Sequence, residues 1–187
     1  MTYINKIFKF LLILLPVISC KKLDKIGFKT YSIKKGRHSS GFHYKSDYKE
    51  TIEFDVIFDE SSIYETEDPV NQADINKLYG VSDGGSHHME SSIRIGWRWY
   101  NNNLELLWFK HELGELSYGL IETIDVNKTY RCKIELKSNT YEISVDNKKV
   151  STPRLFKGVY KHYYLYPYFG GDERAPHNIS IKIKTKR

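Results

Sequence analysis

Two arginines in the middle of the chain carry the clearest binding chemistry in this sequence. Residues 93–100 read Ile-Arg-Ile-Gly-Trp-Arg-Trp-Tyr, so apolar side chains occupy every second position. Successive residues of a strand point to opposite faces, which places Arg94, Arg98 and Tyr100 on the face away from the core. Gly96 lies between the two arginines and has no side chain. We therefore expect a slot between two guanidinium groups, where a carboxylate or hydroxyl ligand would bind.

Tyrosines near the C-terminus are expected to complete a binding surface. Residues 163–169 read Tyr-Tyr-Leu-Tyr-Pro-Tyr-Phe. Alternation would bury Leu165 and Phe169 and leave Tyr164, Tyr166 and Tyr168 together on the open face. Aromatic rings pack against the C–H faces of sugars, and planar guanidinium groups bind sugar hydroxyls and carboxylates. The arginines and tyrosines together predict a glycan-binding groove.

The alternative for the same residues is structural. Tyrosines can cover hydrophobic surface, and arginines on antiparallel sheets commonly form cross-strand ion pairs. Acidic partners for the arginines are available at Glu53, Asp55 and Glu105. The sequence leaves both the binding role and the structural role open.

Catalysis would require a proton-transfer group, for which His111 is the first candidate and Tyr166 the second. Such a base could remove the proton next to a uronate carboxylate while an arginine neutralises that carboxylate. His111 would share its strand face with Glu105, Leu107 and Phe109. A histidine at the end of a strand can equally be a hydrogen-bonded surface residue. The catalytic residues therefore stay unassigned at this point.

The sequence predicts no metal site and no cofactor. His87 and His88 are adjacent, and adjacent side chains of an extended segment point in opposite directions, so a shared metal would need a third ligand. The turn at 172–177 carries two acids and a histidine, but a calcium ion needs about six to eight oxygen ligands. Salt bridges of Arg174 are the simpler expectation for this turn.

The N-terminal segment resembles a bacterial lipoprotein signal. Lys6 and Lys9 precede a short apolar run at residues 10–18, which is too short to span a bilayer as a helix. The following Ser-Cys ends at Cys20, and in such signals cleavage falls before the cysteine, which receives the lipid. An ordinary secretory signal is the alternative.

The resemblance to lipoproteins implies a division of the chain into three parts. Residues 1–19 would be the signal peptide, residues 20–39 a lipidated Cys20 with its tether and a first extended segment, and residues 40–187 the folded domain. A lipid on Cys20 would hold the protein at a membrane of the bacterial cell envelope, on the periplasmic side or the outer surface. The expected partners are thus the membrane, through the lipid, and a polysaccharide or oligosaccharide.

Charge and cysteine content narrow the expected partners. The net charge is +6, of which Lys6 and Lys9 of the leader supply two. A modest basic balance at the cell envelope favours an acidic glycan or a lipid headgroup surface over nucleic acid. Cys132 is the only cysteine besides Cys20, so no intrachain disulfide is expected and packing must stabilise the domain.

The alternation of apolar residues predicts an all-β domain. In addition to a hairpin at 91–111, strands are expected at 48–59, 116–124, 130–136, 141–145, 163–169 and 179–184. Residues 60–76 read as an acidic loop that leads into a helical turn around 70–78, and residues 80–88 read as a flexible connection. About eight to eleven short strands without a long amphipathic helix indicate an antiparallel two-sheet sandwich or jelly roll.

Three segments together resemble the concanavalin A-like lectin/glucanase jelly-roll superfamily: residues 91–109, 130–150 and 164–183. The resemblance covers most of the chain from Ser40 onward. It implies two curved antiparallel sheets with a glycan groove on the concave one. The superfamily includes lectins, β-glucanases and alginate-lyase-like polysaccharide lyases, so the resemblance implies a fold and leaves the activity open.

The motifs for catalysis are only partly present. Arg94 and Arg98 are similar to the arginine-bearing strand of alginate-lyase-like enzymes, and the three late tyrosines are loosely similar to their tyrosine-bearing strand. The Gln-x-His motif of those enzymes is missing, because the only glutamine, Gln72, has no histidine two residues later. The Glu-x-Asp-x-x-Glu strand of glucanases is missing too. We expect a non-catalytic glycan-binding lipoprotein; the alternatives are a polysaccharide lyase or glycoside hydrolase, and a structural or protein-interaction domain.

Overall fold

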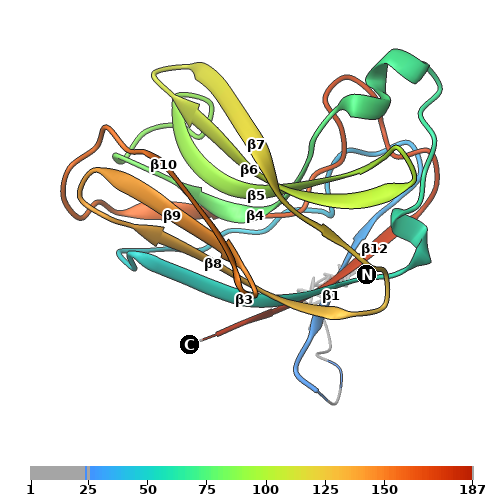
Figure 1. The fold of residues 1–187 in the computed structure, drawn as a ribbon, viewed down its shortest axis with the longest axis horizontal. Helices are drawn as coiled ribbons and strands as arrows, with labels where there is room; N and C mark the ends of the chain where they lie inside the picture. Colours follow the sequence, from blue (N-terminus) through green and yellow to red (C-terminus); the bar gives the residue numbers. More distant parts are fainter. Residues whose placement is uncertain (1–23, 25, 187) are drawn as a thin grey trace, which may run out of the picture.

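The computed structural model describes residue 24 and residues 26–186, which form two antiparallel sheets packed face to face (Figure 1). Each sheet has six strands. The supporting sheet has the strand order β1-β12-β3-β8-β9-β10, and the curved sheet has the order β2-β11-β4-β5-β6-β7. This arrangement confirms the predicted all-β, two-sheet jelly-roll sandwich.

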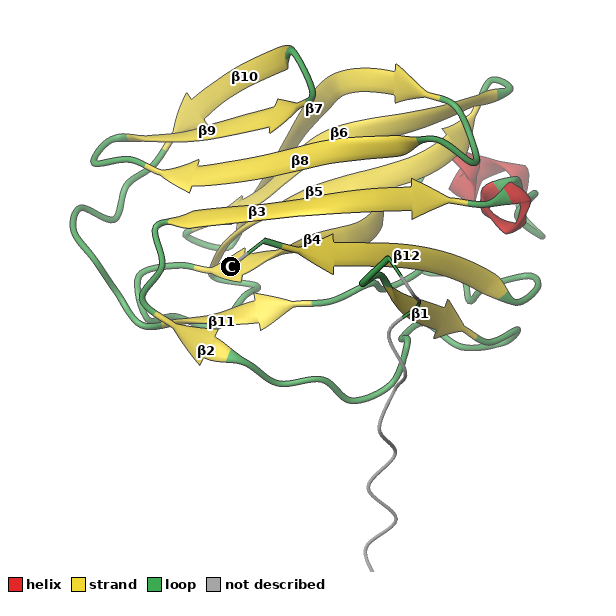
Figure 2. Cartoon of the chain, turned by 90° about the horizontal axis from the view of Figure 1, so that it is seen from below, coloured by secondary structure: helices red, strands yellow, loops and turns green. Residues whose placement is uncertain are grey.

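The strands of the supporting sheet lie side by side in Figure 2. They are β1 (Lys29–Ile33), β12 (Ile179–Thr185), β3 (Thr51–Phe58), β8 (Thr129–Leu136), β9 (Thr140–Val145) and β10 (Lys148–Pro153). The strands of the curved sheet are β2 (Ser46–Asp47), β11 (His162–Leu165), β4 (Asn76–Ser82), β5 (Ser91–Tyr100), β6 (Asn103–Glu112) and β7 (Glu115–Ile124). Two short 3-10 helices, η1 (Glu60–Ser62) and η2 (Pro69–Ala73), connect β3 to β4.

The hydrophobic core lies between the two sheets and follows from the alternation of apolar residues. Phe54 and Val56 of β3 are fully buried there, and so is Cys132 of β8. Burial raises the pKa of the Cys132 thiol, which behaves as a small apolar core residue. The rings of Phe58 and Trp97 meet across the core with their centroids 5.2 Å apart. Each fully buried large apolar side chain stabilises the fold by roughly 1.5–3 kcal/mol.

The sequence predicts a helical turn around 70–78 and a flexible connection at 80–88, and this prediction misses strand β4. The helical turn is η2, which ends at Ala73, and residues 76–82 form a strand between β11 and β5. The pairing of β4 with β5 shifts register between Lys77 and Tyr79, so Leu78 enters the core out of alternation. Gly80 adds a second interruption, because a Cβ there would overlap the carbonyl oxygen of Ile93. The bulge and the glycine hide the strand pattern.

Two further strands complete the edges of the supporting sheet. β10 follows the Asp-Asn turn at 146–147 and pairs with β9. β1 lies within the expected tether segment 20–39 and pairs with β12, so the sheet begins before residue 40. The leader 1–19 and Cys20 lie outside the described residues.

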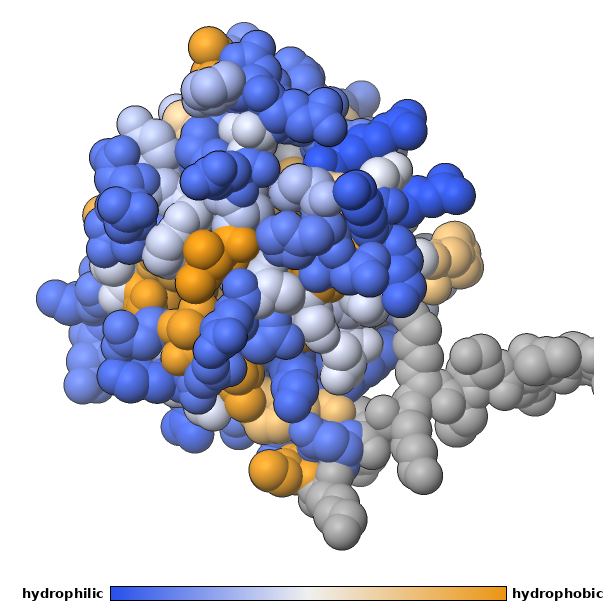
Figure 3. Space-filling view, turned by 90° about the vertical axis from the view of Figure 1, so that its right-hand side faces the viewer, coloured by the Kyte–Doolittle hydropathy of each residue, from blue (hydrophilic) through white to orange (hydrophobic). Residues whose placement is uncertain are grey.

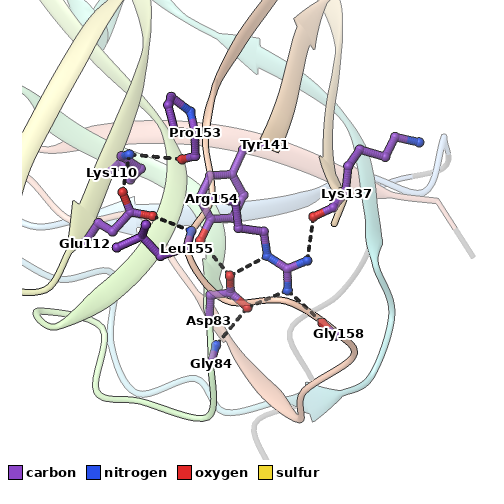
Figure 4. A network of polar contacts seen from close by, with 10 residues as sticks. All are labelled: Asp83, Gly84, Lys110, Glu112, Lys137, Tyr141, Pro153, Arg154, Leu155 and Gly158. Carbon is purple, nitrogen blue, oxygen red and sulfur yellow. Dashed lines mark hydrogen bonds and ion pairs between the residues drawn. The ribbon is translucent and has the colours of Figure 1, made fainter. Parts of the chain in front are cut away.

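A buried ion pair joins the two sheets beyond the end of β4 (Figure 4). The Nε of Arg154 donates to the carboxylate of Asp83 at 2.7 Å, and both side chains are about 1% exposed. The hydroxyl of Tyr141 donates to the same carboxylate at 2.6 Å. Arg154 also donates to the carbonyl oxygens of Lys137 and Gly158. The network ties the loop after β10 to the end of β4, which borders the site described below.

Both 3-10 helices lie at one end of the sandwich, at the right of Figure 1. Figure 3 looks at this end, where hydrophilic residues cover most of the surface and a smaller hydrophobic patch lies among them. Among the residues that the structure describes, no helix is long and apolar enough to cross a membrane.

Candidate functional site

Strand β5 has the side-chain parity that its sequence predicts. The residues of its inner face are buried in the core: Ile93, Ile95 and Trp97. Arg94 pairs with Phe109 of β6, and Arg98 pairs with Glu105. Because directly paired residues of an antiparallel sheet share a face, these four side chains lie on the outer face of the curved sheet.

The slot expected between the two arginines is filled. A Cβ on Gly96 would lie 2.5 Å from Cγ2 of Ile75, because Ile75 packs over this glycine together with Leu107 and Phe109. Ile75 comes from the short link between η2 and β4, whose position over β5 the sequence did not reveal. The apolar cluster separates the arginines into two different environments.

Arg98 has the structural role that the sequence left as an alternative. Its Nε donates to the carboxylate of Glu105 at 2.7 Å, and its Nη1 donates to the carbonyl oxygen of Ala73 at 2.8 Å. Its guanidinium lies 4.6 Å from the centroid of the Tyr100 ring. The charge of Arg98 is therefore already compensated, and Arg98 and Tyr100 lie apart from the surroundings of Arg94.

Arg94 is a buried cation that has no acidic partner within the described chain. Its residue exposure is 7%, and its Nε has no hydrogen-bond partner among the described residues. The guanidinium carbon lies 5.6 Å from the centroid of the Phe109 ring. Burial lowers the pKa of Arg94 to about 10, which leaves it charged at neutral pH. A buried charge without a counter-charge costs several kcal/mol, so this position favours an anion.

A hollow on the outer face of the curved sheet surrounds Arg94. The cavity measures about 400 Å³, and cavities that hold small molecules measure roughly 300–1,000 Å³. We call it the basic cavity, after the residues that carry its chemistry: Lys77, His88, Arg94, Phe109, His111 and Tyr168. Asp172 is the one acidic residue among the described residues that line it.

Lys77 is the second cation of the basic cavity. Its Nζ donates to the carbonyl oxygen of Gly170 at 2.7 Å and lies 5.0 Å from the centroid of the Phe109 ring. Burial and, next in size, the charge of Arg94 lower the pKa of Lys77 to about 8. Lys77 is therefore mostly charged at neutral pH, and an anion beside it would hold its proton more firmly.

His111 contributes a neutral imidazole to the same cavity. Its exposure is 6%, and its Nδ1 has no hydrogen-bond partner within residues 26–186. Burial lowers the pKa of His111, and the charges of Arg94 and Lys77 lower it further. A neutral imidazole can accept a proton, so His111 satisfies the first requirement for a general base.

A bond to Tyr163 orients the ring of His88. The backbone N–H of His88 donates to the Tyr163 hydroxyl oxygen at 2.8 Å, and the same oxygen lies 3.0 Å from Nδ1 of His88. The Tyr163 hydroxyl thus holds the His88 ring through its Nδ1. Burial, followed by the charge of Arg94, lowers the pKa of His88 to about 4. His88 is therefore uncharged at neutral pH.

The expectation that Tyr164, Tyr166 and Tyr168 share the outer face of the sheet is wrong for the first two, although all three border a hollow beside β11 that is described below. Tyr164 pairs with Val81 of β4, and Val81 pairs in turn with Ile93 of β5. Both Val81 and Ile93 are core residues, so Tyr164 is buried on the core side as well. Tyr166 packs against the core, and its ring lies 5.5 Å from that of Tyr79. Neither residue is among the described residues that line the basic cavity.

The chain changes its alternation after β11 ends at Leu165. Pro167 follows outside the strand, and Tyr168 then forms an isolated bridge with Lys77. Tyr168 consequently lies at the basic cavity, and Phe169 enters the core as expected. Leu165 is buried, but it pairs with Gly80 on the outer face of the curved sheet. Proline breaks the strand pairing, so the alternation of inner and outer faces before Pro167 does not predict the faces of the residues after it.

Sequence reasoning missed Lys77, His88 and Tyr163 as site residues. Lys77 lies on β4, a strand that the sequence pattern does not reveal. His88 lies at the end of the segment 80–88, which the sequence indicates as a flexible connection. The one available signal was the placement of two histidines directly before the arginine-bearing strand. Tyr163 begins the tyrosine segment at 163–169. The predicted alternation of inner and outer faces in this segment is shifted by one residue at Tyr163 and Tyr164.

The turn at 170–177 is held by hydrogen bonds, and Arg174 forms no ion pair with the described residues. The Glu173 carboxylate accepts the backbone N–H groups of Glu67 and Asp68 and the side-chain amide of Asn71. These bonds fasten the loop before β4 to the wall of the basic cavity. The described residues contain no cluster of three or more side chains suited to hold a metal ion.

Comparison with known proteins bears on the fold. No protein-family model matches the chain, and no curated protein matches it in sequence. A solved structure of the alginate lyase AlyC3 is similar, with a TM-score of 0.60 at 12% identity over 88% of this chain and 76% of that chain. The same lyase in complex with dimannuronate gives 0.54 at 13%, over 88% and 75%.

A third solved structure, the catalytic domain of a laminarinase from Thermotoga petrophila RKU-1, gives a TM-score of 0.55 at 11% identity, over 86% of this chain and 76% of that chain. At such low identity these similarities concern the fold alone. Together with the two six-stranded sheets, they show that the chain has the concanavalin A-like jelly-roll fold.

Proposed function

We propose that the basic cavity binds an acidic polysaccharide or oligosaccharide and holds a uronate carboxylate against Arg94 and Lys77. The observation that carries the proposal is the buried guanidinium of Arg94, which has no acidic partner among the described residues. Arginine matches the planar geometry of a carboxylate, and lysine adds a second positive charge. The neutral imidazole of His88 adds a hydrogen-bonding group for a sugar hydroxyl.

Two features favour a sugar acid over other anions. The cavity lies on the outer face of the curved sheet and combines its charges with the exposed ring of Tyr168, which suits the C–H face of a pyranose. Proteins of the same fold include an alginate lyase solved with dimannuronate, a uronate disaccharide. The fold by itself does not determine function, so the proposal depends on the cavity and not on the similarity.

Calorimetric titration of the folded domain with uronate oligosaccharides and with neutral glucans of equal length tests the proposal. We expect saturable binding of the uronates and no binding of the glucans, because a buried, unpaired cation selects for charge. Equal affinity for the two classes, or no affinity for any uronate, would contradict it.

A second candidate function is β-elimination of the bound uronate, and the position of His111 favours it. The neutral imidazole lies in the same cavity as the proposed carboxylate site. It could take the proton next to the carboxylate, whose negative charge Arg94 would balance; a C=C bond then forms as the glycosidic C–O bond breaks, and the departing oxygen takes a proton from solvent. Ultraviolet absorbance from an unsaturated uronate, lost in His111→Asn, would establish the lyase; binding without absorbance would establish a non-catalytic binder.

We also propose that a lipid on Cys20 anchors the domain to a membrane of the bacterial cell envelope. The support is the sequence alone: two lysines, a short apolar run and a small residue before the cysteine. Such an anchor would hold the domain close to the cell surface, where it would meet polysaccharide.

A further inference from the structure

A second hollow adjoins the basic cavity on the side of β11. It measures about 350 Å³, and its walls are mostly aromatic. We call it the aromatic cleft, after the rings that line it: His43, Tyr44, His88, Tyr163, Tyr164, Tyr166 and Tyr168. His88 and Tyr168 line both hollows, so the two hollows adjoin each other.

The two hollows differ in charge. Arg94 and Lys77 line the basic cavity, whereas no arginine, lysine or carboxylate is among the described residues that line the aromatic cleft. Tyrosine rings supply broad apolar faces with a hydrogen-bonding hydroxyl at the edge, a combination that suits a sugar ring and its hydroxyl groups. The cleft is thus suited to the uncharged faces of a ligand whose charge lies in the neighbouring cavity.

Tyr44 is the ring most available for a ligand. Its side chain belongs to the segment before β2, is 69% exposed and forms no ring-ring contact with the described residues. Tyr168, by contrast, stacks on His38 with a centroid distance of 5.1 Å, which fixes the orientation of its ring at the junction of the two hollows. Tyr163 is fixed by its bonds to His88. The rings of Tyr163 and Tyr168 are thus held in place, whereas the Tyr44 ring is exposed to a ligand.

We propose that the aromatic cleft is a second sugar subsite, so that the protein binds an acidic chain of at least two residues and not a single uronate. The inference rests on the proposed function, since it assigns one residue of the chain to the basic cavity through its carboxylate. The adjacent residue lies against Tyr44 and Tyr163 in the cleft. The ligand class is therefore an oligomeric or polymeric uronate glycan.

Calorimetry with monomeric, dimeric and tetrameric mannuronates tests this subsite in the wild type, Tyr44→Ala and Tyr48→Ala. Tyr48 is a matched control, because it is 61% exposed directly after β2 but is not among the residues that line the cleft. We expect the wild type to bind the dimer and tetramer more tightly than the monomer. In Tyr44→Ala the affinity for the longer ligands should fall by about fivefold, while Tyr48→Ala should bind like the wild type.

The outcomes separate this subsite from the function on which it rests. Affinity that is the same for all three lengths, or the same in Tyr44→Ala and the wild type, would overturn the aromatic subsite and leave the carboxylate site standing. Failure of the wild type to bind any of the mannuronates would overturn both. Equal losses in Tyr44→Ala and Tyr48→Ala would also overturn the subsite, because the effect would not then depend on the cleft.

Discussion

Ile75 packs directly over Gly96, with its Cγ2 at 2.5 Å from the position that a Cβ on the glycine would occupy. This contact divides two arginines that are neighbours on one strand face. On one side, Arg98 is neutralised by Glu105. On the other side, Arg94 is buried without an acidic partner in the described chain and faces the basic cavity.

The contact predicts a non-additive pair of substitutions. Gly96→Ala forces a methyl group into Ile75 and should lower the free energy of unfolding by about 1–3 kcal/mol. In an Ile75→Ala background the methyl no longer overlaps Cγ2 of Ile75 and keeps only its 3.0 Å contact with the carbonyl oxygen of Asn76, so the double variant should lose less than the sum of the single losses. Urea denaturation followed by tryptophan fluorescence measures all three. Strict additivity would show that the two residues do not contact each other.

The buried Asp83–Arg154 pair predicts a large loss of stability. Asp83→Asn leaves the guanidinium of Arg154 buried without a counter-charge, so the free energy of unfolding should fall by about 3–5 kcal/mol. Asp125→Asn is the matched control, since Asp125 forms a solvent-exposed ion pair with Lys128. The control should leave the denaturation midpoint unchanged. Similar midpoints for the two variants would mean that the buried network does not stabilise the loop after β10.

Lys77 predicts a pH dependence of ligand binding. Its pKa is about 8 in the folded protein, below the ordinary value of 10.5, so it loses its charge as the pH rises through 8. A bound carboxylate favours the charged form, and affinity should therefore fall between about pH 7 and pH 9. Lys77→Arg keeps the charge and should remove this decline in affinity. Lys77→Met lacks the charge and should bind the ligand weakly at both ends of this pH range. A decline of equal size in Lys77→Arg would assign the titration to another group.

The same shift has a consequence for the ligand-free protein. Between about pH 8 and 10.5 the unfolded chain holds a proton on Lys77 that the folded chain has released, so the contribution of Lys77 to stability rises with pH in this window. The denaturation midpoint of the wild type, minus that of Lys77→Met, should therefore be larger at the upper end of this pH window than at its lower end. The opposite sign would place Lys77 in a stabilising ion pair.

The lipid anchor predicts a difference between the two cysteines. In the full chain expressed in bacteria, Cys20→Ser should abolish incorporation of labelled fatty acid and move the protein from the detergent phase to the aqueous phase. Cys132→Ala should leave both properties unchanged, because Cys132 is buried in the core. Labelling that persists in Cys20→Ser would exclude the anchor at this position.

The sequence was sufficient for the architecture and for the faces of β5, because large apolar residues alternate without interruption from Ile93 to Trp97. It was not sufficient for β4, where a bulge at Leu78 and the glycine at position 80 break the pattern. The parity of Tyr164 and Tyr166 could not be derived either, since Pro167 ends the pairing and tyrosine suits either face. The long-range contact of Ile75 with Gly96 has no local signature at all.

The site was predictable only in part for the same reason. Arg94 and His111 lie on strands whose alternation is regular, and both were identified as candidates. Lys77 and His88 come from segments whose structure was not predicted, and only the fold brings them beside Arg94. The pairing of Arg98 with Glu105 was foreseen as an alternative, but sequence could not tell which of the two arginines would be neutralised.

The most direct test of the account is the dissociation constant of a uronate oligosaccharide for the wild type, Arg94→Gln and Arg98→Gln. We expect Arg94→Gln to lose about 10- to 100-fold in affinity, the equivalent of one charge-assisted hydrogen bond, and to gain stability, because the uncompensated buried charge is removed. Arg98→Gln should lose stability, because Glu105 loses its partner, and should keep the wild-type affinity. Unchanged affinity in Arg94→Gln, or an equal loss in Arg98→Gln, would contradict the assignment of Arg94 as the carboxylate-binding residue.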